Sequence, residues 1–384
     1  MNFFPINDIP VNYFFSEPIY VDDGFILTSQ EMPFTLELKN ALKEWNFDKV
    51  RSEGQPQENH HNGTKAQSKK AGLLSLNDGT KLADAMVFYA DFQRFAEDIF
   101  TRAASNGRIS YEIVAEKIRD VCEEIKVNRR FLLQVQKDIK AEGNYDFLAV
   151  HSVKSTIISI IIGSYLKLPA HRLIELGIAA LLHEIGMVKL PPHIVQSGSE
   201  LSTKDRNMLM LHPTIGFELL KSLDFPMVIN AAALEHHERE NGSGYPHKLS
   251  GDKIGLYGKI IAVACSYEAI TAKRPHKDAR GGHEGITDLL RNEGKRYNES
   301  IIRALVFSLS IYPIGQFVLL SNGSRAQVVD VNPADPRFPI VQVLDEKNLD
   351  GQNKIIETNP AGIYIRTPLA NGVVDVSDPA SSVQ

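Results

Sequence analysis

Histidine is the residue type whose distribution in this sequence first suggests chemistry. Ten of the twelve histidines lie between residues 151 and 283, and neutral imidazole is the commonest metal ligand in proteins. One of them, His183, is followed directly by Glu184 in LLHEIGMVKLP, after the apolar run ELGIAALL. A carboxylate at a core position is costly unless a cation, a hydrogen bond or a turn to solvent compensates. The pair is therefore either part of a metal site or a helix end exposed to water.

A second segment with ligand chemistry is LEHHERENGSGYP at residues 234–246. His236 and His237 end an apolar helix, and a Gly-Ser-Gly turn then leads to Tyr245. Glycines permit positive φ, so the backbone can fold back closely over whatever the two histidines hold. Paired histidines occur by chance on helix surfaces, but this glycine-rich, Tyr-Pro continuation is much rarer.

Helices must position these groups, because the centre of the chain has apolar residues at three- and four-residue spacing. Long helices are predicted in ADAMVFYADFQRFAEDIFTRAAS and SYEIVAEKIRDVCEEIKVNRRFLLQVQKDI, with a break at Asn106-Gly107. Ser202 and Asp205 in LSTKD predict a capping box at a further helix start. The later helices are predicted at residues 148–167, 171–186, 203–223, 226–239, 254–273 and 284–308.

The two ends of the chain have a different pattern. Alternating residues around Asp22-Asp23-Gly24 predict a hairpin, and β-rich runs around Asn322-Gly323 predict a β module. The fold class is therefore mainly α, with a central all-helical bundle flanked by a small N-terminal α/β module and a small C-terminal β module. In chain order, we predict an α/β module at 1–52, a flexible linker at 53–71 and a helical connector at 72–147. The histidine-bearing domain follows at 148–311, then a β-barrel-like module at 312–368 and a disordered tail at 369–384.

Composition excludes several classes of protein. A net charge of −5 argues against a general nucleic-acid binder, so no DNA or RNA partner is expected. Two cysteines cannot form a disulfide framework. The N-terminus MNFFPINDIP lacks the charged and apolar regions of a signal peptide, and the longest aliphatic run, residues 156–166, is short of the ~20 residues that span a bilayer. We therefore expect a cytoplasmic protein without a membrane partner.

The combination of HEIGM and HHERENGSGYP resembles the HD-GYP family, the metal-dependent hydrolases of cyclic di-GMP within the HD-domain superfamily. The resemblance covers residues 148 to 308 and implies a helical HD-GYP bundle there. It implies that Tyr245 contacts the cyclic dinucleotide and that Arg274 and Lys277, in RPHK, hold phosphate oxygens. With Glu184 as the bridging carboxylate, the implied metal ligands are His151, His183, Glu184, His212, His236 and His237.

This ligand set suits two divalent first-row metals, Fe or Mn before Zn, with a single metal left open. The ions would clamp a phosphodiester, and a metal-bound hydroxide would attack phosphorus. The reaction implied by the resemblance opens cyclic di-GMP to pGpG and/or GMP in bacterial second-messenger signalling. Besides cyclic di-GMP, a homodimer or a protein signalling partner is expected.

Four positions depart from the family pattern. Glu184 replaces an Asp and can still bridge with shifted geometry, whereas Met187 replaces a Lys that approaches the scissile phosphate. Phe147 stands where members with a third metal carry Glu, so a trinuclear site is not expected. Cys265 stands where the family has a metal-binding Asp and is either a small buried hydrophobe or a possible thiolate ligand. Lys189 is expected to point elsewhere and not to substitute for the missing Lys.

These departures leave three functions open. The first is the enzyme, and the second is a catalytically degenerate receptor or scaffold that binds cyclic di-GMP without cleaving it. The third is hydrolysis of a different phosphate ester, because the metal chemistry of the superfamily is broader than one substrate. The remaining histidines are expected to be bystanders on surfaces and in loops, with phosphate orientation as the alternative for the last two, and these are His60, His61, His171, His193, His276 and His283.

Overall fold

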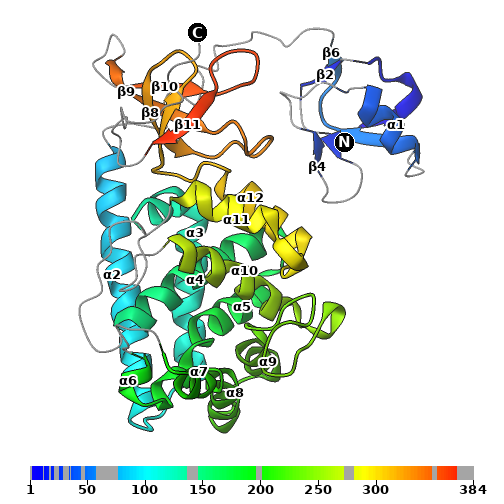
Figure 1. The fold of residues 1–384 in the computed structure, drawn as a ribbon. Coiled ribbons are helices and arrows are strands. Elements are labelled where there is room, and N and C mark those ends of the chain that lie inside the picture. Colours follow the sequence, from blue (N-terminus) through cyan, green and yellow to red (C-terminus); the bar gives the residue numbers. More distant parts are fainter. Residues whose placement is uncertain are drawn as a thin grey trace. The chain divides into compact units, whose positions relative to one another are not determined.

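The computed structural model describes most of the chain, namely residues 2–11, 13–16, 19–20, 26–28, 34, 36–44, 48–57, 77–135, 146–195, 201–271, 281–347 and 353–369. It divides into two compact units, Met1–Leu74 and Ser75–Gln384, which are described separately. The first unit is a small α/β module and the second is mostly helical with a β module at its C-terminal end, as Figure 1 shows. The predicted fold class is thereby confirmed.

Among its described residues the first unit contains one α-helix, α1 (Leu36–Glu44), one 3-10 helix, η1 (Ile6–Asp8), and short antiparallel strands. Its larger sheet has the order β1-β5-β3-β4, formed by Asn2–Pro5, Lys49–Ser52, Ile19–Tyr20 and Ile26–Thr28. A second pair joins β2 (Phe14–Phe15) to β6 (Pro56–Gln57), so two residues predicted to belong to the linker form a strand. Strands β3 and β4 form the predicted hairpin, and the turn residues between them lie outside the described residues.

The helices of the second unit, in chain order, are α2 (Asn77–Ala104), α3 (Tyr111–Val135), α4 (Asp146–Tyr165), α5 (Ala170–Leu182), α6 (Pro192–Val195), α7 (Thr203–Leu209), α8 (His212–Ser222), α9 (Met227–Glu235), α10 (Leu256–Thr271), α11 (Gly282–Arg291) and α12 (Glu299–Leu309). Three short 3-10 helices lie between them, η2 (Ile185–Lys189), η3 (Gly251–Lys253) and η4 (Glu293–Lys295). The predicted break at Asn106-Gly107 is confirmed, and so is the Ser202 cap, whose hydroxyl accepts from the Asp205 N–H.

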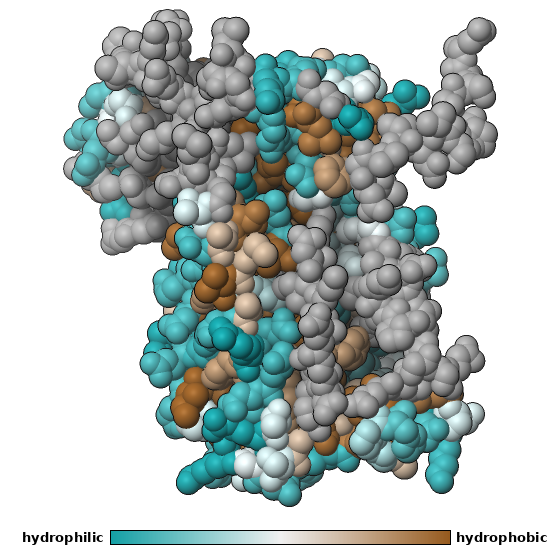
Figure 2. All heavy atoms as spheres, turned by 90° about the vertical axis from the view of Figure 1, so that its left-hand side faces the viewer, coloured by the Kyte–Doolittle hydropathy of each residue, from teal (hydrophilic) through white to brown (hydrophobic). Residues whose placement is uncertain are grey.

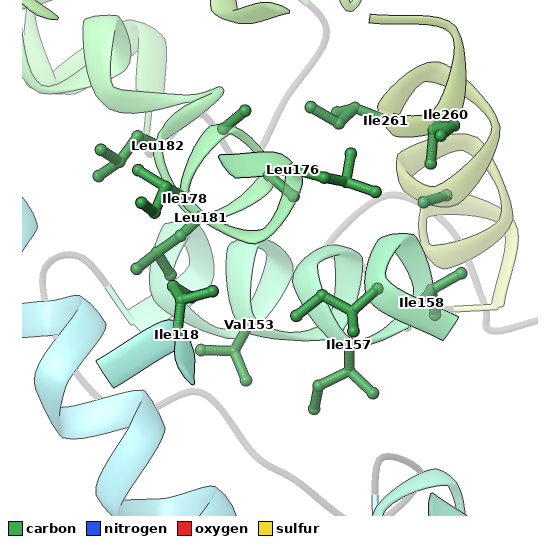
Figure 3. Close-up of a cluster of buried hydrophobic side chains, with 14 of the residues drawn as sticks. Ile118, Val153, Ile157, Ile158, Leu176, Ile178, Leu181, Leu182, Ile260 and Ile261 are labelled. Atoms are coloured by element: carbon green, nitrogen blue, oxygen red, sulfur yellow. The ribbon is translucent and has the colours of Figure 1, made fainter. Parts of the chain in front are cut away.

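Helix α4 is the centre of this unit. It packs against α5, α10, α2 and α12, and Figure 3 shows its residues Ile157 and Ile158 among side chains from the neighbouring helices. Each fully buried isoleucine stabilises the fold by about 1.5–3 kcal/mol. Within the described residues, the segment Phe147–Tyr165 is long and apolar enough to cross a membrane, but 83% of that window is buried inside the protein. Packing in the core accounts for its apolar composition.

Helices α2 and α3, which were predicted as a connector, are part of the same core. Phe92 and Phe100 of α2 and Ile118 of α3 are buried and belong to the hydrophobic cluster of α4 and α5. Both helices are amphipathic, and their apolar faces are covered by the central helices. Figure 2 views the side of the unit formed by α2, where apolar side chains lie between polar ones, and Met86 and Val87 of this helix are exposed.

Two of the predicted helices are each divided in the structure. The predicted helix at 203–223 is α7 followed by α8, because Pro213 lies in the first turn of α8 and is not tolerated in a helix interior. The predicted helix at 284–308 is α11 followed by α12. Asn292 ends α11 in the left-handed conformation, and the Asn298 side chain caps α12 by accepting from the next N–H groups. Periodicity alone did not reveal these breaks.

The C-terminal β module is one five-stranded antiparallel sheet with the order β10-β9-β8-β7-β11. Its strands are Asn353–Glu357, Ile340–Lys347, Arg325–Asp330, Phe317–Leu320 and Ile365–Leu369. The predicted turn at Asn322-Gly323 joins β7 to β8, with Gly323 at φ 85°. The inward residues of these strands, Val318, Val328 and Val341 among them, form a core of their own.

A prediction for this fold concerns Gly177 of α5. A Cβ at Gly177 would lie 2.4 Å from Ile118 Cγ2 and 3.1 Å from Ile160 Cδ1. Helices α3, α4 and α5 therefore pack so closely here that there is no room for a side chain on residue 177. We expect Gly177→Ala to lower the free energy of unfolding by about 1–3 kcal/mol, measured by chemical denaturation. The control is Gly281→Ala, where the nearest atom, Gln316 Oε1, would be 3.5 Å away. Equal unfolding midpoints for both variants would contradict the prediction.

Candidate metal centre

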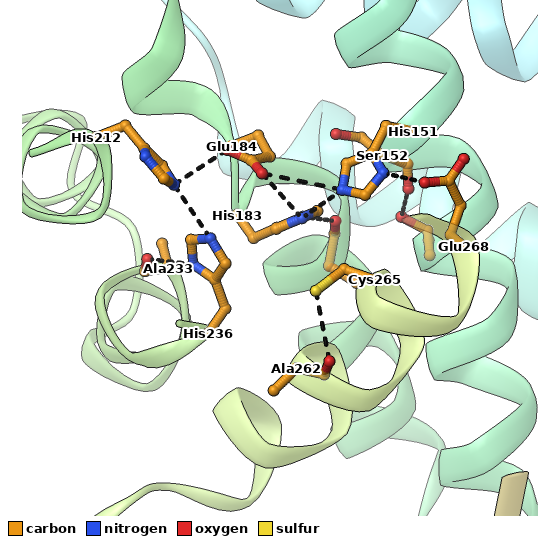
Figure 4. Close-up of polar contacts among 12 residues, drawn as sticks. His151, Ser152, His183, Glu184, His212, Ala233, His236, Ala262, Cys265 and Glu268 are labelled. Atoms are coloured by element: carbon orange, nitrogen blue, oxygen red, sulfur yellow. Dashed lines mark hydrogen bonds and ion pairs between the residues drawn. The ribbon is translucent and has the colours of Figure 1, made fainter. Parts of the chain in front are cut away.

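The six predicted metal ligands come from helix ends and from the central helix. His151 lies in α4, His183 follows the last residue of α5, and Glu184 directly precedes η2. His212 begins α8, and His236 with its neighbour His237 follows the last residue of α9. Figure 4 shows side chains from α4, α5, α8 and α9 pointing toward one another.

The structure brings all six residues together in two groups. His151, His183 and Glu184 offer ligand atoms within 4.8 Å of one another, and so do Glu184, His212, His236 and His237. Glu184 belongs to both groups. Its Oε1 is 3.9 Å from Nε2 of both His151 and His183, and its Oε2 is 3.1 Å from His212 Nε2. The two carboxylate oxygens therefore face different histidines, which is the arrangement of a bridging ligand.

Hydrogen bonds to backbone fix the tautomer of three of the histidines. Nδ1 of His183 donates to the Ala180 carbonyl at 2.7 Å, and Nδ1 of His236 donates to the Ala233 carbonyl at 2.8 Å. His212 makes the same bond to the last residue of α7, Leu209, at 2.7 Å. These carbonyls lie in the last turns of their helices, where they have no partner within the helix. Since a carbonyl only accepts, the proton is on Nδ1 and the lone pair of Nε2 is free.

The free Nε2 atoms face each other. Those of His183 and His151 are 3.3 Å apart, and those of His212 and His236 are 3.2 Å apart. Because His183, His212 and His236 carry their protons on Nδ1, acceptor atoms meet acceptor atoms. Oε2 of Glu184 is buried and has no hydrogen-bond donor among the described residues. This donor set fits a cation, which satisfies converging lone pairs and a buried carboxylate at once.

The ionisation states suit metal ligation. Burial lowers the pKa of His183 to about 4, against the opposing charge of Glu184, and it holds the pKa of His236 and His237 well below the ordinary value. Burial raises the pKa of Glu184, but the adjacent histidines, led by His212, lower it to about 2. Neutral imidazole and ionised carboxylate are the forms that bind metals.

Tyr245 covers one end of the cluster. Its ring stacks on His237 with centroids 4.6 Å apart and 21° between planes, and its N–H donates to the His237 carbonyl at 3.3 Å. A Cβ at Gly244 would be 2.4 Å from Glu238 Cα, so only glycine allows the turn to approach this closely. The expectation that the glycine-rich turn folds back over the paired histidines is confirmed.

Two buried glutamates near the cluster were missed by sequence reasoning. Glu238, 2% exposed, accepts the N–H groups of His247 and Leu249 at 2.7 and 2.9 Å and holds the loop after the paired histidines. Glu268 of α10, 3% exposed, accepts the Nδ1 proton of His151. A charged residue at a helical core position is the one signal that could have drawn attention to Glu268, whereas Glu238 lies in a charged stretch without a distinguishing signal.

The departures from the family pattern have distinct surroundings. Met187 is buried in the hydrophobic core, so no cation stands at that position. Phe147 is 39% exposed, and its ring stacks on His151 at 6.3 Å with 10° between planes. Cys265 is buried, its thiol donates to the Ala262 carbonyl at 3.6 Å, and neither ligand group includes it. Lys189 points away to the end of α2, as expected.

The other predicted residues fall into two sets. Arg274 and Lys277, the predicted phosphate ligands, lie outside the described residues, as do His60, His61 and His276. His193 is exposed and lies 3.5 Å from Asp205, as a surface residue. The prediction for His283 as a solvated loop residue is wrong. It lies in α11, where its ring stacks on Tyr312 at 4.7 Å and its Nδ1 donates to the Ile311 carbonyl.

Comparisons with known proteins agree with this geometry. A family model described as an HD domain matches residues 136–301. The chain is 24% identical over 292 residues to the cyclic di-GMP phosphodiesterase PdeB of Borreliella burgdorferi, covering 68% of this chain and 76% of the relative. It is 27% identical over 338 residues to a cyclic di-GMP phosphodiesterase of Pseudomonas aeruginosa, covering 85% and 79%. A 3'3'-cGAMP-specific phosphodiesterase of Vibrio cholerae is 30% identical over 130 residues, covering 33% and 25%.

The helical fold and the His/Glu cluster, together with this match, define the central part of the second unit as an HD domain. The HEIGM and GYP-type motifs lie within the residues that the family model matches, and the chain is similar to named cyclic di-GMP phosphodiesterases over most of its length.

The surroundings of Lys189 generate a prediction. Its Nζ donates to the carbonyls of Ala103 and Ala104, at 2.5 and 3.3 Å, and to Asn106 Oδ1 at 2.6 Å. It therefore caps the C-terminus of α2. We expect Lys189→Met to lower the free energy of unfolding by about 0.5–2 kcal/mol and to leave metal content unchanged. Denaturation and metal analysis check this, with the exposed Lys204→Met as control. Unchanged stability with lost metal would contradict it.

A second prediction concerns Gly186, where η2 approaches α8. A Cβ there would lie 2.0 Å from the His212 carbonyl oxygen and 2.6 Å from the Gly216 nitrogen. Gly186→Ala must separate η2 from α8 and so move Glu184 away from His212. We expect metal affinity, measured by equilibrium dialysis, to fall by about 10-fold or more. Metal affinity equal to that of the wild type would show that the close approach does not position Glu184.

Proposed function

We propose that this chain is a metal-dependent phosphodiesterase that hydrolyses cyclic di-GMP. The observation that carries the proposal is the convergence of imidazole Nε2 atoms on the two oxygens of Glu184. Such a set of neutral imidazoles and one carboxylate is suited to metal-assisted hydrolysis of a phosphate ester and has no evident role without a cation. Similarity to named cyclic di-GMP phosphodiesterases supports the substrate.

The two ligand groups divide the predicted residues between two ions. One ion would be held by His151, His183 and Glu184, and the other by Glu184 with His212, His236 and His237. The nitrogen-rich donor set favours Fe, Mn or Zn over Mg. Bound ions of this kind polarise a phosphodiester and lower the pKa of water, so that a nucleophile is available near neutral pH.

The chain's own residues would bind and orient the substrate. Burial raises the pKa of Tyr245, so its phenol stays protonated and can donate a hydrogen bond to a phosphate oxygen or a base edge. Arg274 would hold phosphate oxygens through its planar guanidinium, and Lys277 would add a point charge. Glu184, held between two groups of histidines, would keep both ions at fixed positions relative to one phosphodiester. The products are pGpG and/or GMP.

The cellular setting is part of the same proposal. Both cysteines, Cys122 and Cys265, are buried and not joined to each other in a disulfide, which is consistent with a reducing compartment. We therefore place the reaction in the cytoplasm, with a second copy of the chain or a signalling protein as its partner. The small modules at the two ends of the chain are the candidates for that contact.

A cyclic di-GMP receptor without hydrolytic activity is the second candidate function. The observation that favours it is the buried, apolar Met187 at the position where a cation is expected, together with the absence of Cys265 from both ligand groups. Loss of a charge that stabilises a transition state reduces turnover by about 10²–10³-fold, which leaves binding intact.

The test is turnover by protein purified anaerobically and loaded with Mn or Fe. We expect cyclic di-GMP to disappear and pGpG or GMP to form, with activity lost on chelation and restored by metal. Tight binding measured by calorimetry with the nucleotide recovered intact would support the receptor instead. Faster cleavage of 3'3'-cGAMP, or of another phosphate ester, than of cyclic di-GMP would redirect the substrate assignment.

A variant pair tests the ligand assignment within the same assay. His236→Gln removes an Nε2 atom from the three-histidine group, and we expect hydrolysis to fall by about 100-fold or more together with metal content. The control is His193→Gln, because His193 is exposed and lies outside both ligand groups. Equal activity and equal metal content for the two variants would remove His236 from the centre.

A further inference from the structure

Glu268 is a buried carboxylate directly behind the metal centre. It lies in α10, it is 3% exposed, and it accepts the Nδ1 proton of His151, a residue 117 positions away in the chain. Figure 4 shows its side chain reaching from α10 toward His151 on the side away from His212. Burying a charged carboxylate is costly unless a hydrogen bond or an opposite charge compensates for the lost hydration. The contact between Glu268 and a predicted ligand histidine therefore calls for an explanation.

The position of His151 in its helix explains why a carboxylate is needed there. His183, His212 and His236 each donate Nδ1–H to a carbonyl three residues earlier, at the C-terminal end of a helix. His151 instead lies inside α4, where carbonyl groups accept bonds from the helix itself. Among the described residues, the partner of its Nδ1 is accordingly a side chain and not a helix-end carbonyl. The acceptor must come from another helix, and Glu268 of α10 supplies it.

The two ligand groups also differ in their number of histidines. One contains His212, His236 and His237 with Glu184, whereas the other contains only His151 and His183 with Glu184. Both groups share the single negative charge of Glu184. A carboxylate hydrogen-bonded to a ligand imidazole raises its basicity and fixes its orientation, so the poorer group is the one that receives this support.

We propose that Glu268 is a positioning residue that holds His151 in the ligand tautomer and strengthens the weaker of the two ion sites. It does so through one hydrogen bond, which directs Nε2 of His151 toward Glu184 and His183. The buried phenol of Tyr89 in α2 lies near enough to Glu268 that burial and the charge of this carboxylate together raise its pKa. The carboxylate is thus enclosed between α2, α4 and α10. This inference rests on the metal centre proposed above.

The test compares Glu268→Gln with the wild-type chain by metal binding rather than by activity. Glutamine keeps the size of the side chain and one acceptor oxygen but removes the charge. We expect the weaker of the bound Mn ions to dissociate about 10–100-fold more readily, measured by equilibrium dialysis with metal analysis, while the tighter ion keeps its affinity. The electron paramagnetic resonance signal should change from that of a coupled pair to that of a single ion.

A matched control is Glu175→Gln. Glu175, in α5, accepts a hydrogen bond from the hydroxyl of Tyr257 in α10 at 2.8 Å and is partly buried, but it lies outside both ligand groups. We expect this variant to bind Mn as the wild type does. Near-ultraviolet circular dichroism of both variants establishes that they are folded. Glu268→Ala is a more severe change, and it is used only if its near-ultraviolet spectrum matches that of the wild type.

Three outcomes would overturn the inference. Unchanged affinity for both ions in Glu268→Gln would show that the carboxylate does not support His151. An equal loss for both ions, in step with a loss of stability, would show a merely structural role. A wild-type chain that binds no ion would remove the proposed metal centre as well. Conversely, a wild-type chain that binds two ions, loses one in Glu268→Gln and still leaves cyclic di-GMP intact would sink the proposed hydrolysis and leave the role of Glu268 standing.

Discussion

The hydrogen bond from imidazole Nδ1 to a helix-terminal carbonyl is the interaction on which the metal centre depends. It satisfies an orphan carbonyl of α5, α7 and α9, and in each case it leaves Nε2 without a proton. Each such bond stabilises the fold by about 0.5–1.5 kcal/mol. The larger consequence is directional, because helix ends that converge on one point turn all the free lone pairs toward that point.

Facing lone pairs repel one another, so something else must hold them together in the absence of a cation. The apolar core around α4 does this. Gly163 of α4 lies against Leu173 and Leu176, and Gly177 of α5 lies against Ile118 and Ile160, which brings the helix axes close. A packed core deforms little, so it can keep side chains in an arrangement that is locally unfavourable. The unfavourable free energy of the facing lone pairs is thus compensated by apolar packing outside the cluster.

Sequence patterns identified the residues that converge in the cluster but not the groups that orient them. His183-Glu184 and His236-His237 are adjacent in the chain, and the glycine-rich turn after the second pair is visible as a motif. Such local features can be recognised in the sequence without knowledge of the tertiary structure. The contact of Glu268 with His151 spans 117 residues, and it depends on how α10 packs against α4. The buried orientation of Met187 and the division of the predicted helix at Pro213 were likewise decided by packing and by one backbone constraint.

The candidate site differs from the family pattern most in the charges that it carries. Met187 contributes no positive charge and Cys265 contributes no carboxylate, so the carboxylates in contact with the predicted ligand histidines include Glu184 and, behind His151, Glu268. In the proposed reaction, neutralising the phosphodiester would then depend on the bound ions and on Arg274 and Lys277. A residue that tightens ion binding would therefore have a larger effect on the proposed turnover than in a site with its own lysine. In the proposed function, the hydrogen bond between His151 and Glu268 would therefore help to determine whether the chain cleaves cyclic di-GMP or only binds it.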